Sequence, residues 1–175
     1  MKDAVKTPST TALRRIALKH QGLLGKRPMG RGIPGALKAL EQLAYVQIDT
    51  ISVVERAHNH TMWTRTSAFK ESHYNRLIER GQAFEYWFHA ASFLPMRDFR
   101  FSLPMKNAQA LRRKHQVKDR KLLRHILDRI GAEGPLTSRD FETPPRNSRG
   151  WWDWKPAKQA LEQLFKVVDP TTPLA

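Results

Sequence analysis

Cysteine is absent from the 175-residue chain, which excludes disulfide frameworks, thiol nucleophiles and cysteine-based zinc sites. No stretch approaches the roughly 18 consecutive apolar residues of a membrane-spanning helix. The first residues, MKDAVKTPST, also lack the apolar segment of a secretion signal. We therefore expect a cytoplasmic protein whose chemistry depends on carboxylates, amides, hydroxyls or histidines.

Acidic residues are also scarce. The chain has 16 Asp and Glu against 31 Lys and Arg, a formal net charge of +15 and an isoelectric point near 10.7. A surplus of this size repels itself and indicates a polyanionic partner, of which nucleic acid is the first candidate. An anionic membrane surface fits less well, because the basic residues are spread along the whole chain and do not line one amphipathic helix.

Sustained alternation of apolar and polar residues is rare, and helical patterns divided by Gly and Pro dominate the sequence. One helix is expected to begin with Thr10 or Thr11 as its N-cap and to end near Leu24. Further helices are expected over residues 34–44, 60–69, 72–80 and 105–134, the last as one long helix or two consecutive ones. A short strand or hairpin, AFEYWFHAASFLP, ends at Pro95. The predicted fold class is mainly α with short β-strands.

Two segments near the end of the chain have the order of a helix-turn-helix. GPLTSRDF predicts a short capped helix, and KPAKQALEQLF predicts an amphipathic helix with Pro156 in its first turn. In a helix-turn-helix the second helix lies in the major groove of DNA. Helix pairs of this kind are also common in purely structural settings.

The segment YVQIDTI holds an amide and a carboxylate two positions apart, within the best strand candidate, VQIDTISVV. On a strand, Gln47 and Asp49 share one face, whereas on a helix they would splay apart. Such a pair is able to activate water, with Asp49 as general base or counter-charge and Gln47 orienting the water. The alternative is structural: a solvated strand face, or an Asp49 side chain that caps a turn.

Three separated blocks of sequence carry a family resemblance: LAYVQIDTISVVERAHNHTMWTRT, EYWFHAASFLPMRDFR and GWWDWKPAKQALEQLF. In this order they resemble the winged-helix DNA glycosylases of the AlkZ/YcaQ type, and more closely the YcaQ-like (AlkX) branch. The resemblance runs from about Leu13 to about Phe165. It implies tandem winged-helix domains, expected at residues 1–115 and 116–175. The second is expected to be truncated, because family members continue where this chain gives DPTTPLA.

The resemblance also implies an activity. The family carries a Gln-x-Gln or Gln-x-Asp catalytic motif, so Gln47 and Asp49 take the catalytic positions. Family members remove N7-alkylated purines and unhook interstrand crosslinks. This implies a nucleoid-associated repair enzyme that acts on damaged double-stranded DNA, with no cofactor and no obligate protein partner. The alternatives are a non-catalytic winged-helix DNA-binding protein, an inactive truncated relative and, with less support, an RNA-associated basic protein.

Several other residues are candidate DNA contacts. Arg56 and Arg65 follow the catalytic motif, where contact with phosphate is expected. His89 matches a histidine in the family's second motif and is expected to contact DNA or the lesion. In the second domain the expected DNA contacts are Arg149, Lys155 and Lys158. The structural alternatives are surface solvation for the arginines and a partly buried, backbone-bonded ring for His89.

Three remaining groups have ordinary structural explanations. His58 and His60 would bind a metal only with ligands from elsewhere in the chain, so no metal site is expected. Glu85 is explained equally well as a second acid near the site or as a salt-bridge partner. The clustered Trp151, Trp152 and Trp154 are expected in a core and not stacked on bases.

Overall fold

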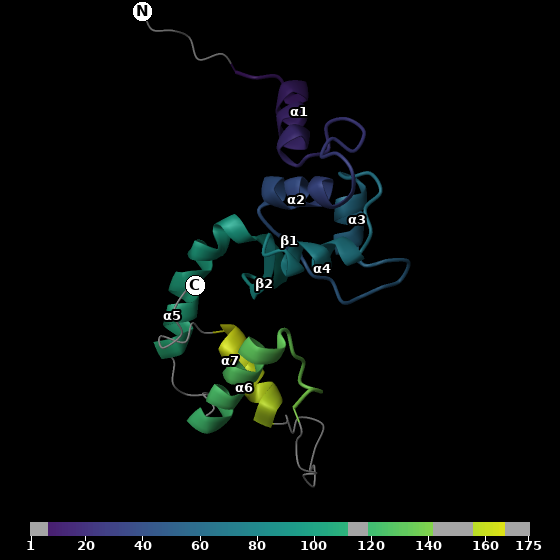
Figure 1. Cartoon of the computed structure of the whole chain (residues 1–175). Helices are drawn as coiled ribbons and strands as arrows, with labels where there is room; N and C mark the ends of the chain where they lie inside the picture. The colour runs from purple at the N-terminus through teal and green to yellow at the C-terminus, as the bar shows by residue number, and fades with distance from the viewer. Residues whose placement is uncertain (1–6, 112–118, 142–155, 167–175) are drawn as a thin grey trace, which may run out of the picture. The chain divides into compact units, whose positions relative to one another are not determined.

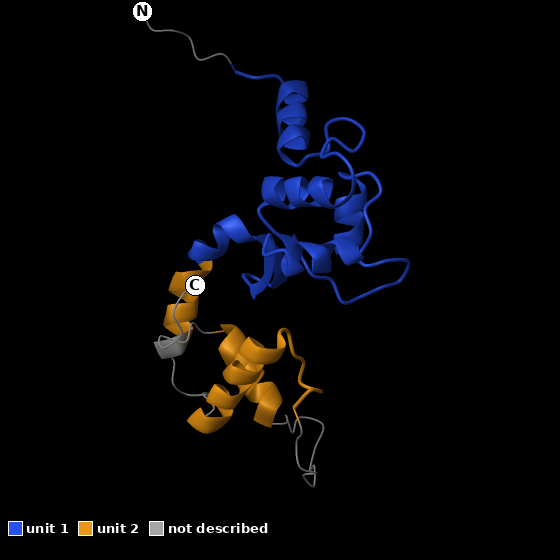
Figure 2. Cartoon of the chain, viewed as in Figure 1, with its two compact units in different colours: residues 1–101 blue, residues 102–175 orange. Residues whose placement is uncertain are grey.

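The computed structural model describes residues 7–111, 119–141 and 156–166. Figure 1 shows the helices and strands, and Figure 2 colours the two compact units into which the chain divides, Met1–Phe101 (unit 1) and Ser102–Ala175 (unit 2). Each unit has an apolar core of its own, so the two are described separately.

Unit 1 combines four helices with a small antiparallel sheet in its described part. Its elements are α1 (Thr10–His20), α2 (Gly32–Leu43), β1 (Val46–Gln47), α3 (Ala57–Trp63), α4 (Ser72–Glu79), β2 (Ala83–Trp87) and β3 (Ala91–Pro95), followed by a 3₁₀ helix, Met96–Ser102. The strands lie in the order β1-β3-β2. From α2 onward, this succession of helix, strand, helix pair and hairpin is consistent with a winged helix, in which α3 and α4 form the helix-turn-helix.

Local sequence signals explain where several helices begin and end. Ser9 caps α1, because its Oγ accepts the N–H of Ala12 at 3.2 Å, so the predicted cap at Thr10 or Thr11 is slightly late. Helix α1 ends at His20, short of the predicted Leu24, just before Gly22 adopts a φ of +65°. Gly81, with a φ of +62°, follows the end of α4 as predicted.

The sheet of unit 1 is packed on both faces. One face buries Val46 and Phe93 in the same core as residues of α2, α3 and α4, including Leu40, Met62, Tyr74 and Leu77. The opposite face packs its buried apolar residues, Phe84, Tyr86 and Leu94, against Met96 and Phe99. Full burial of one large apolar side chain contributes roughly 1.5–3 kcal/mol. Packing on both sides therefore holds the β2–β3 hairpin and the end of β1 in fixed positions.

Unit 2 contains α5 (Leu103–Leu111), α6 (Arg120–Glu133) and α7 (Pro156–Lys166) in its described part. Asp119 caps α6, because its Oδ1 accepts the N–H groups of Lys121 and Leu122 at 3.0 Å each. The Lys106 ammonium donates to the Phe165 carbonyl at 2.8 Å and so joins α5 to α7. The core of this unit forms mainly between α6 and α7, around Ile126, Phe141, Ala157 and Ala160.

The structure confirms the predicted fold class, a mainly helical chain with a small antiparallel sheet. The hairpin ending at Pro95 and the helix beginning at Pro156 are also confirmed. None of the described helices is long and apolar enough to cross a membrane. The compact units meet at Phe101 and Ser102, ahead of the expected domain boundary at 115/116. The interpretation of both units as winged-helix domains stays a prediction.

Two predicted helices differ from the structure. The helix expected over residues 60–69 instead spans residues 57–63. The short helix expected over residues 134–141 is wrong, because the described residues there form a turn. In this turn Asp140 Oδ2 accepts the N–H of Thr137 at 2.6 Å and its hydroxyl at 2.8 Å. Such local side-chain bonds offer the backbone an alternative to helical hydrogen bonds.

Candidate active site

Gln47 and Asp49 lie where the first strand ends. Gln47 is exposed and pairs with Ser92 of β3. The N–H of Ile48 still donates to the Ala91 carbonyl at 2.7 Å, and the chain then leaves the sheet. The long strand predicted over VQIDTISVV is therefore wrong beyond its first residues. It fails because the Asp49 side chain, and not a neighbouring strand, bonds the backbone that follows.

The Asp49 carboxylate closes the loop that follows it. Its Oδ1 accepts the N–H of Ile51 at 3.0 Å, and its Oδ2 accepts the N–H of Ala57, the first residue of α3, at 3.3 Å. The bond from Ile51, followed by the bond from Ala57, holds the pKa of Asp49 below its usual value. Asp49 is therefore ionised at neutral pH. A carboxylate offers about four lone-pair sites, so acceptor capacity remains after these two bonds.

A buried histidine fixes the backbone of Asp49. His58 is 3% exposed, and its Nδ1 accepts the Asp49 N–H at 3.1 Å. In a neutral ring an accepting Nδ1 leaves the proton on Nε2. Burial is the main cause that lowers the pKa of His58, followed by the nearby Arg56 charge. The ring is therefore neutral at pH 7, in the form that can accept the Asp49 N–H.

Tyr74 of α4 supports the same histidine. Its hydroxyl donates to the His58 carbonyl at 2.9 Å, and burial raises the pKa of Tyr74, so the phenol stays a donor. The two rings meet edge to face with centroids 5.6 Å apart, and Tyr74 stacks on Phe93 of β3 at 4.1 Å. The sequence alone indicated no role for Tyr74, because no local pattern joins it to residues 16 and 19 positions away. Contacts through α3, α4 and β3 thus set the position of Asp49.

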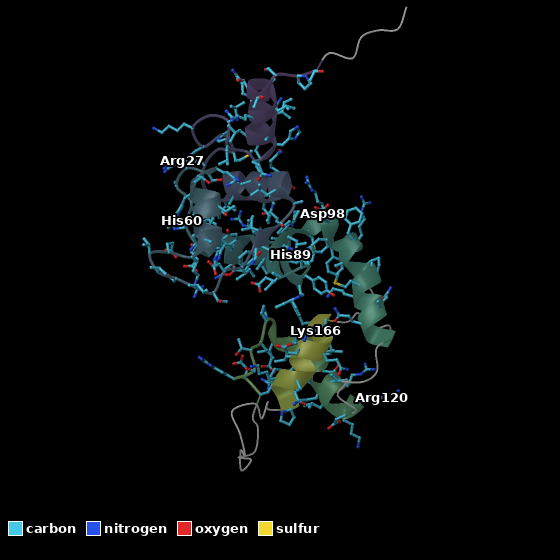
Figure 3. All side chains as sticks on the ribbon, turned by 180° about the vertical axis from the view of Figure 1, so that it is seen from behind. Arg27, His60, His89, Asp98, Arg120 and Lys166 are labelled. Atoms are coloured by element: carbon cyan, nitrogen blue, oxygen red, sulfur yellow. The ribbon has the colours of Figure 1, made fainter. Side chains whose placement is uncertain are left out.

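The turn of the hairpin brings two aromatic residues near the start of β1. His89, labelled in Figure 3, lies in this turn and is exposed. Its ring meets Tyr45 edge to face with centroids 5.2 Å apart, and Phe88 lies 6.4 Å from the same Tyr45 ring. Tyr45 is two residues before Gln47, so the hairpin turn flanks the Gln47 side of the site. The predicted contact of His89 with DNA stays a prediction.

Glu85 does not lie beside Gln47. It pairs with Phe93, which in turn pairs with Val46, so Glu85 is on the sheet face opposite to Gln47. It is also on β2, which β3 separates from β1. Partial burial raises the pKa of Glu85. The sheet geometry therefore does not favour Glu85 as a second acid at the same centre.

Two arginines with the same predicted role have opposite environments. Arg56 is exposed, and its guanidinium forms an ion pair with Glu71 at 3.5 Å. Arg65 is 7% exposed and donates to the carbonyl groups of Gln21 and Thr61, each at 2.7 Å. These bonds join α3 to the chain after α1. The geometry favours a structural role for Arg65 over the predicted phosphate contact, while Arg56 stays a candidate contact.

The remaining predicted residues are distributed over both units. His60 meets Trp63 edge to face at 5.4 Å on α3, well apart from His89 in Figure 3. Within the stretches that the structure describes, no three His, Asp or Glu side chains gather as metal ligands would. Lys158 is exposed on α7 in unit 2. Outside the described residues lie Arg149, Lys155 and the tryptophans Trp151, Trp152 and Trp154.

Comparison with known proteins identifies the family. No solved structure matches the chain. A family model described as DNA glycosylase AlkZ-like matches residues 40–168, well over half of the chain. The match includes β1 with Gln47, the loop after Asp49, helices α3 and α4, and the β2–β3 hairpin. The chain belongs to the AlkZ-like DNA glycosylase family.

Proposed function

We propose that this chain is a DNA N-glycosylase that releases N7-alkylated purines from double-stranded DNA, with Asp49 and Gln47 at the reacting centre. One observation carries the proposal. In a chain of this family, a half-buried, ionised carboxylate is held in place by two backbone bonds and retains acceptor sites. Its membership of a DNA glycosylase family and its charge of +15 both support DNA as the partner.

The chemistry requires little more than one well-placed anion. A purine alkylated at N7 is cationic, so the C1′–N9 bond breaks with its electron pair moving to N9. The base leaves neutral, without a general acid. The sugar is left as an oxocarbenium ion, to which water adds at C1′ while losing a proton, and the product is an abasic site. Glycosidases that act on neutral sugars need two carboxylates for comparable steps.

Asp49 acts mainly through its charge. A fixed carboxylate stabilises the positive charge that develops on the sugar in the transition state. Asp49 also accepts the proton of the attacking water. A general base is most effective when its pKa is near the working pH, and the lowered pKa of Asp49 makes it a weak base. Electrostatic stabilisation is therefore the larger contribution, and Gln47 orients the water through its amide.

The proposal extends to interstrand crosslinks. A crosslinked base is tethered to the opposite strand and cannot rotate by about 180° into a closed pocket, as ordinary base flipping requires. Gln47 is exposed and Asp49 is only half-buried. A site of this kind accepts a lesion at the surface of the protein, without enclosing the base.

A second candidate function is DNA binding without catalysis. The observation that favours it is that both Asp49 oxygens already accept backbone N–H groups. This gives the residue a structural role whether or not it performs chemistry. In that case the chain would bind duplex DNA and release no base.

The test uses the full chain on a duplex with a single N7-methylguanine, followed by alkaline cleavage at abasic sites. We expect strand scission above spontaneous depurination, and a loss of at least about 100-fold in Asp49→Asn. DNA affinity of this variant should be unchanged or higher, which separates lost chemistry from lost folding. Asp98→Asn is the matched control, because it removes a carboxylate of unit 1 on the 3₁₀ helix, and it should excise at the wild-type rate.

Two results would contradict the proposal. Asp49→Asn excising as fast as the wild type would remove Asp49 from the mechanism. Duplex binding by the wild-type chain without any release of the base would support the non-catalytic function.

A further inference from the structure

The loop after Asp49 ends in an exposed apolar tip. Val53 and Val54, here called the valine tip, are 91% and 90% exposed, and Ile51 is 71% exposed. Figure 1 shows the segment between β1 and α3 as a loop that extends away from the body of unit 1. Burying such side chains is favourable, so an exposed apolar group of this kind indicates a surface that is covered by a partner.

Hydrogen bonds to two carboxylates hold the base of this loop in place. Asp49 accepts the N–H groups of Ile51 and Ala57, so one carboxylate holds both ends of the loop together. Glu55 Oε1 accepts the Arg56 N–H at 2.8 Å and the Asn59 side-chain amide at 3.2 Å. The loop therefore presents two β-branched side chains, which are stiff at χ1, on a base fixed by hydrogen bonds.

We propose that the valine tip inserts into duplex DNA beside the nucleotide whose sugar faces Asp49, and separates that nucleotide from its neighbour. This inference rests on the proposed function. The carboxylate that would face the sugar is the same group that closes the base of the loop, so a nucleotide held at Asp49 brings the duplex against the tip.

Charge and chemistry both favour DNA as the occupant. The chain has about twice as many basic as acidic residues, and residues 4–40 of unit 1 include no Asp or Glu. Arg56, at the base of the loop, is exposed, and its guanidinium is paired with the exposed Glu71 at 3.5 Å. Proteins that deform DNA often insert one or two apolar side chains between base steps, while basic residues bind the flanking phosphates. Two valines on a short loop have the size and polarity for this role.

The experiment measures unstacking and excision separately. The duplex for unstacking carries 2-aminopurine next to a tetrahydrofuran abasic analogue, and the fluorescence of 2-aminopurine rises when it loses its stacking partner. The full wild-type chain, the double variant V53S/V54S and Asp49→Asn are compared at saturating protein. The matched control is L13S/I16S, which removes two apolar side chains of α1 that are each 52% exposed.

We expect a fluorescence rise with the wild type, L13S/I16S and Asp49→Asn, and little or none with V53S/V54S. In the N7-methylguanine assay V53S/V54S should lose about 10- to 100-fold in rate, the factor expected when two buried apolar contacts become hydroxyls. Its thermal unfolding should match that of the wild type, because both valines are exposed in the free protein.

The outcomes distinguish this inference from the proposed function. An equal fluorescence rise with wild type and V53S/V54S overturns the insertion, whatever the excision rates are. A rise that depends on the valines, in a chain that releases no base, supports insertion and overturns the glycosylase. If V53S/V54S keeps the DNA signal and loses concentration-dependent self-association in sedimentation, the tip binds a second copy of the chain and the inference is wrong.

Discussion

The polar side chains around the candidate site fall into two groups that differ in what holds them. One group is buried and bonded to backbone groups: His58, Arg65 and Tyr74. The other is exposed: Gln47, Arg56 and His89. In the buried group, His58 and Tyr74 set the position of Asp49, while Arg65 joins α3 to the chain after α1. The exposed group is available to a ligand. Substitutions in the first should therefore reduce stability, and substitutions in the second should reduce binding or catalysis alone.

Among the buried residues, substitution of His58 should have the largest effect on stability. His58→Ala removes the acceptor of the Asp49 N–H and leaves a cavity beside the stacked rings of Tyr74 and Phe93. We expect a loss of about 2–4 kcal/mol in the free energy of unfolding, measured with urea. His58→Asn places an amide oxygen near the position of Nδ1, whereas His58→Gln places it nearer to Nε2. His58→Asn should retain a higher excision rate than His58→Gln or His58→Ala. Equal losses of excision rate in all three variants would contradict a positioning role for His58.

Arg65 and Arg56 allow the most direct comparison between the buried and the exposed group. Arg65→Ala removes a buried guanidinium with three hydrogen bonds, and we expect a loss of about 2–3 kcal/mol in the free energy of unfolding. Arg56→Ala should change stability by less than about 0.5 kcal/mol. It should instead make the dependence of log affinity for duplex DNA on log salt concentration less steep, by about 1 in slope. The same salt slope in Arg56→Ala and wild type would remove Arg56 from the DNA contacts.

Acid should lower the free energy of unfolding, because His58 is neutral and buried in the folded protein. Because its folded pKa is lowered, the unfolded chain takes up a proton first, near pH 6.5. The free energy of unfolding should therefore fall as the pH drops below about 6.5, and this loss should stop below the folded pKa. Arg56 adds to the lowering, while Glu71, Asp49 and Glu55 oppose it. Thermal unfolding of His58→Asn should depend less on pH than that of the wild type, and an equal dependence would exclude His58 as the cause.

A small effect on stability is also expected at Gln47. Its side chain is exposed, so Gln47→Ala should change the free energy of unfolding by less than about 0.5 kcal/mol. Excision should still fall by about 10- to 100-fold, because the attacking water loses its orientation. Wild-type excision in this variant would show that Asp49 alone positions the water.

The sequence predicted the elements whose signals are local. The β2–β3 hairpin combines aromatic residues with a final Pro95, and α7 begins at Pro156. The length of β1 was not predictable from propensity, because Asp49 takes backbone N–H groups that a strand would have used. The burial of Arg65 was not predictable either, because its hydrogen-bond partner Gln21 lies 44 positions earlier in the chain.

The role proposed for Gln47 and Asp49 was only partly predictable from the sequence. The residues of YVQIDTI left open whether Asp49 performs chemistry or caps a turn, and the family resemblance favoured chemistry. The structure adds a turn that Asp49 does close. The two readings therefore describe the same carboxylate and do not exclude each other. What no local pattern indicated is the support from His58 and Tyr74 on separate helices.

The double use of Asp49 has a consequence for mutational screens. In a library where cellular abundance and repair are scored separately, substitutions at Gln47 should lower only the repair score. Substitutions at Asp49 other than Asn should lower both, because the loop loses its closure together with the charge. A filter that discards poorly expressed variants would then classify Asp49, the residue proposed to be central to catalysis, as merely structural.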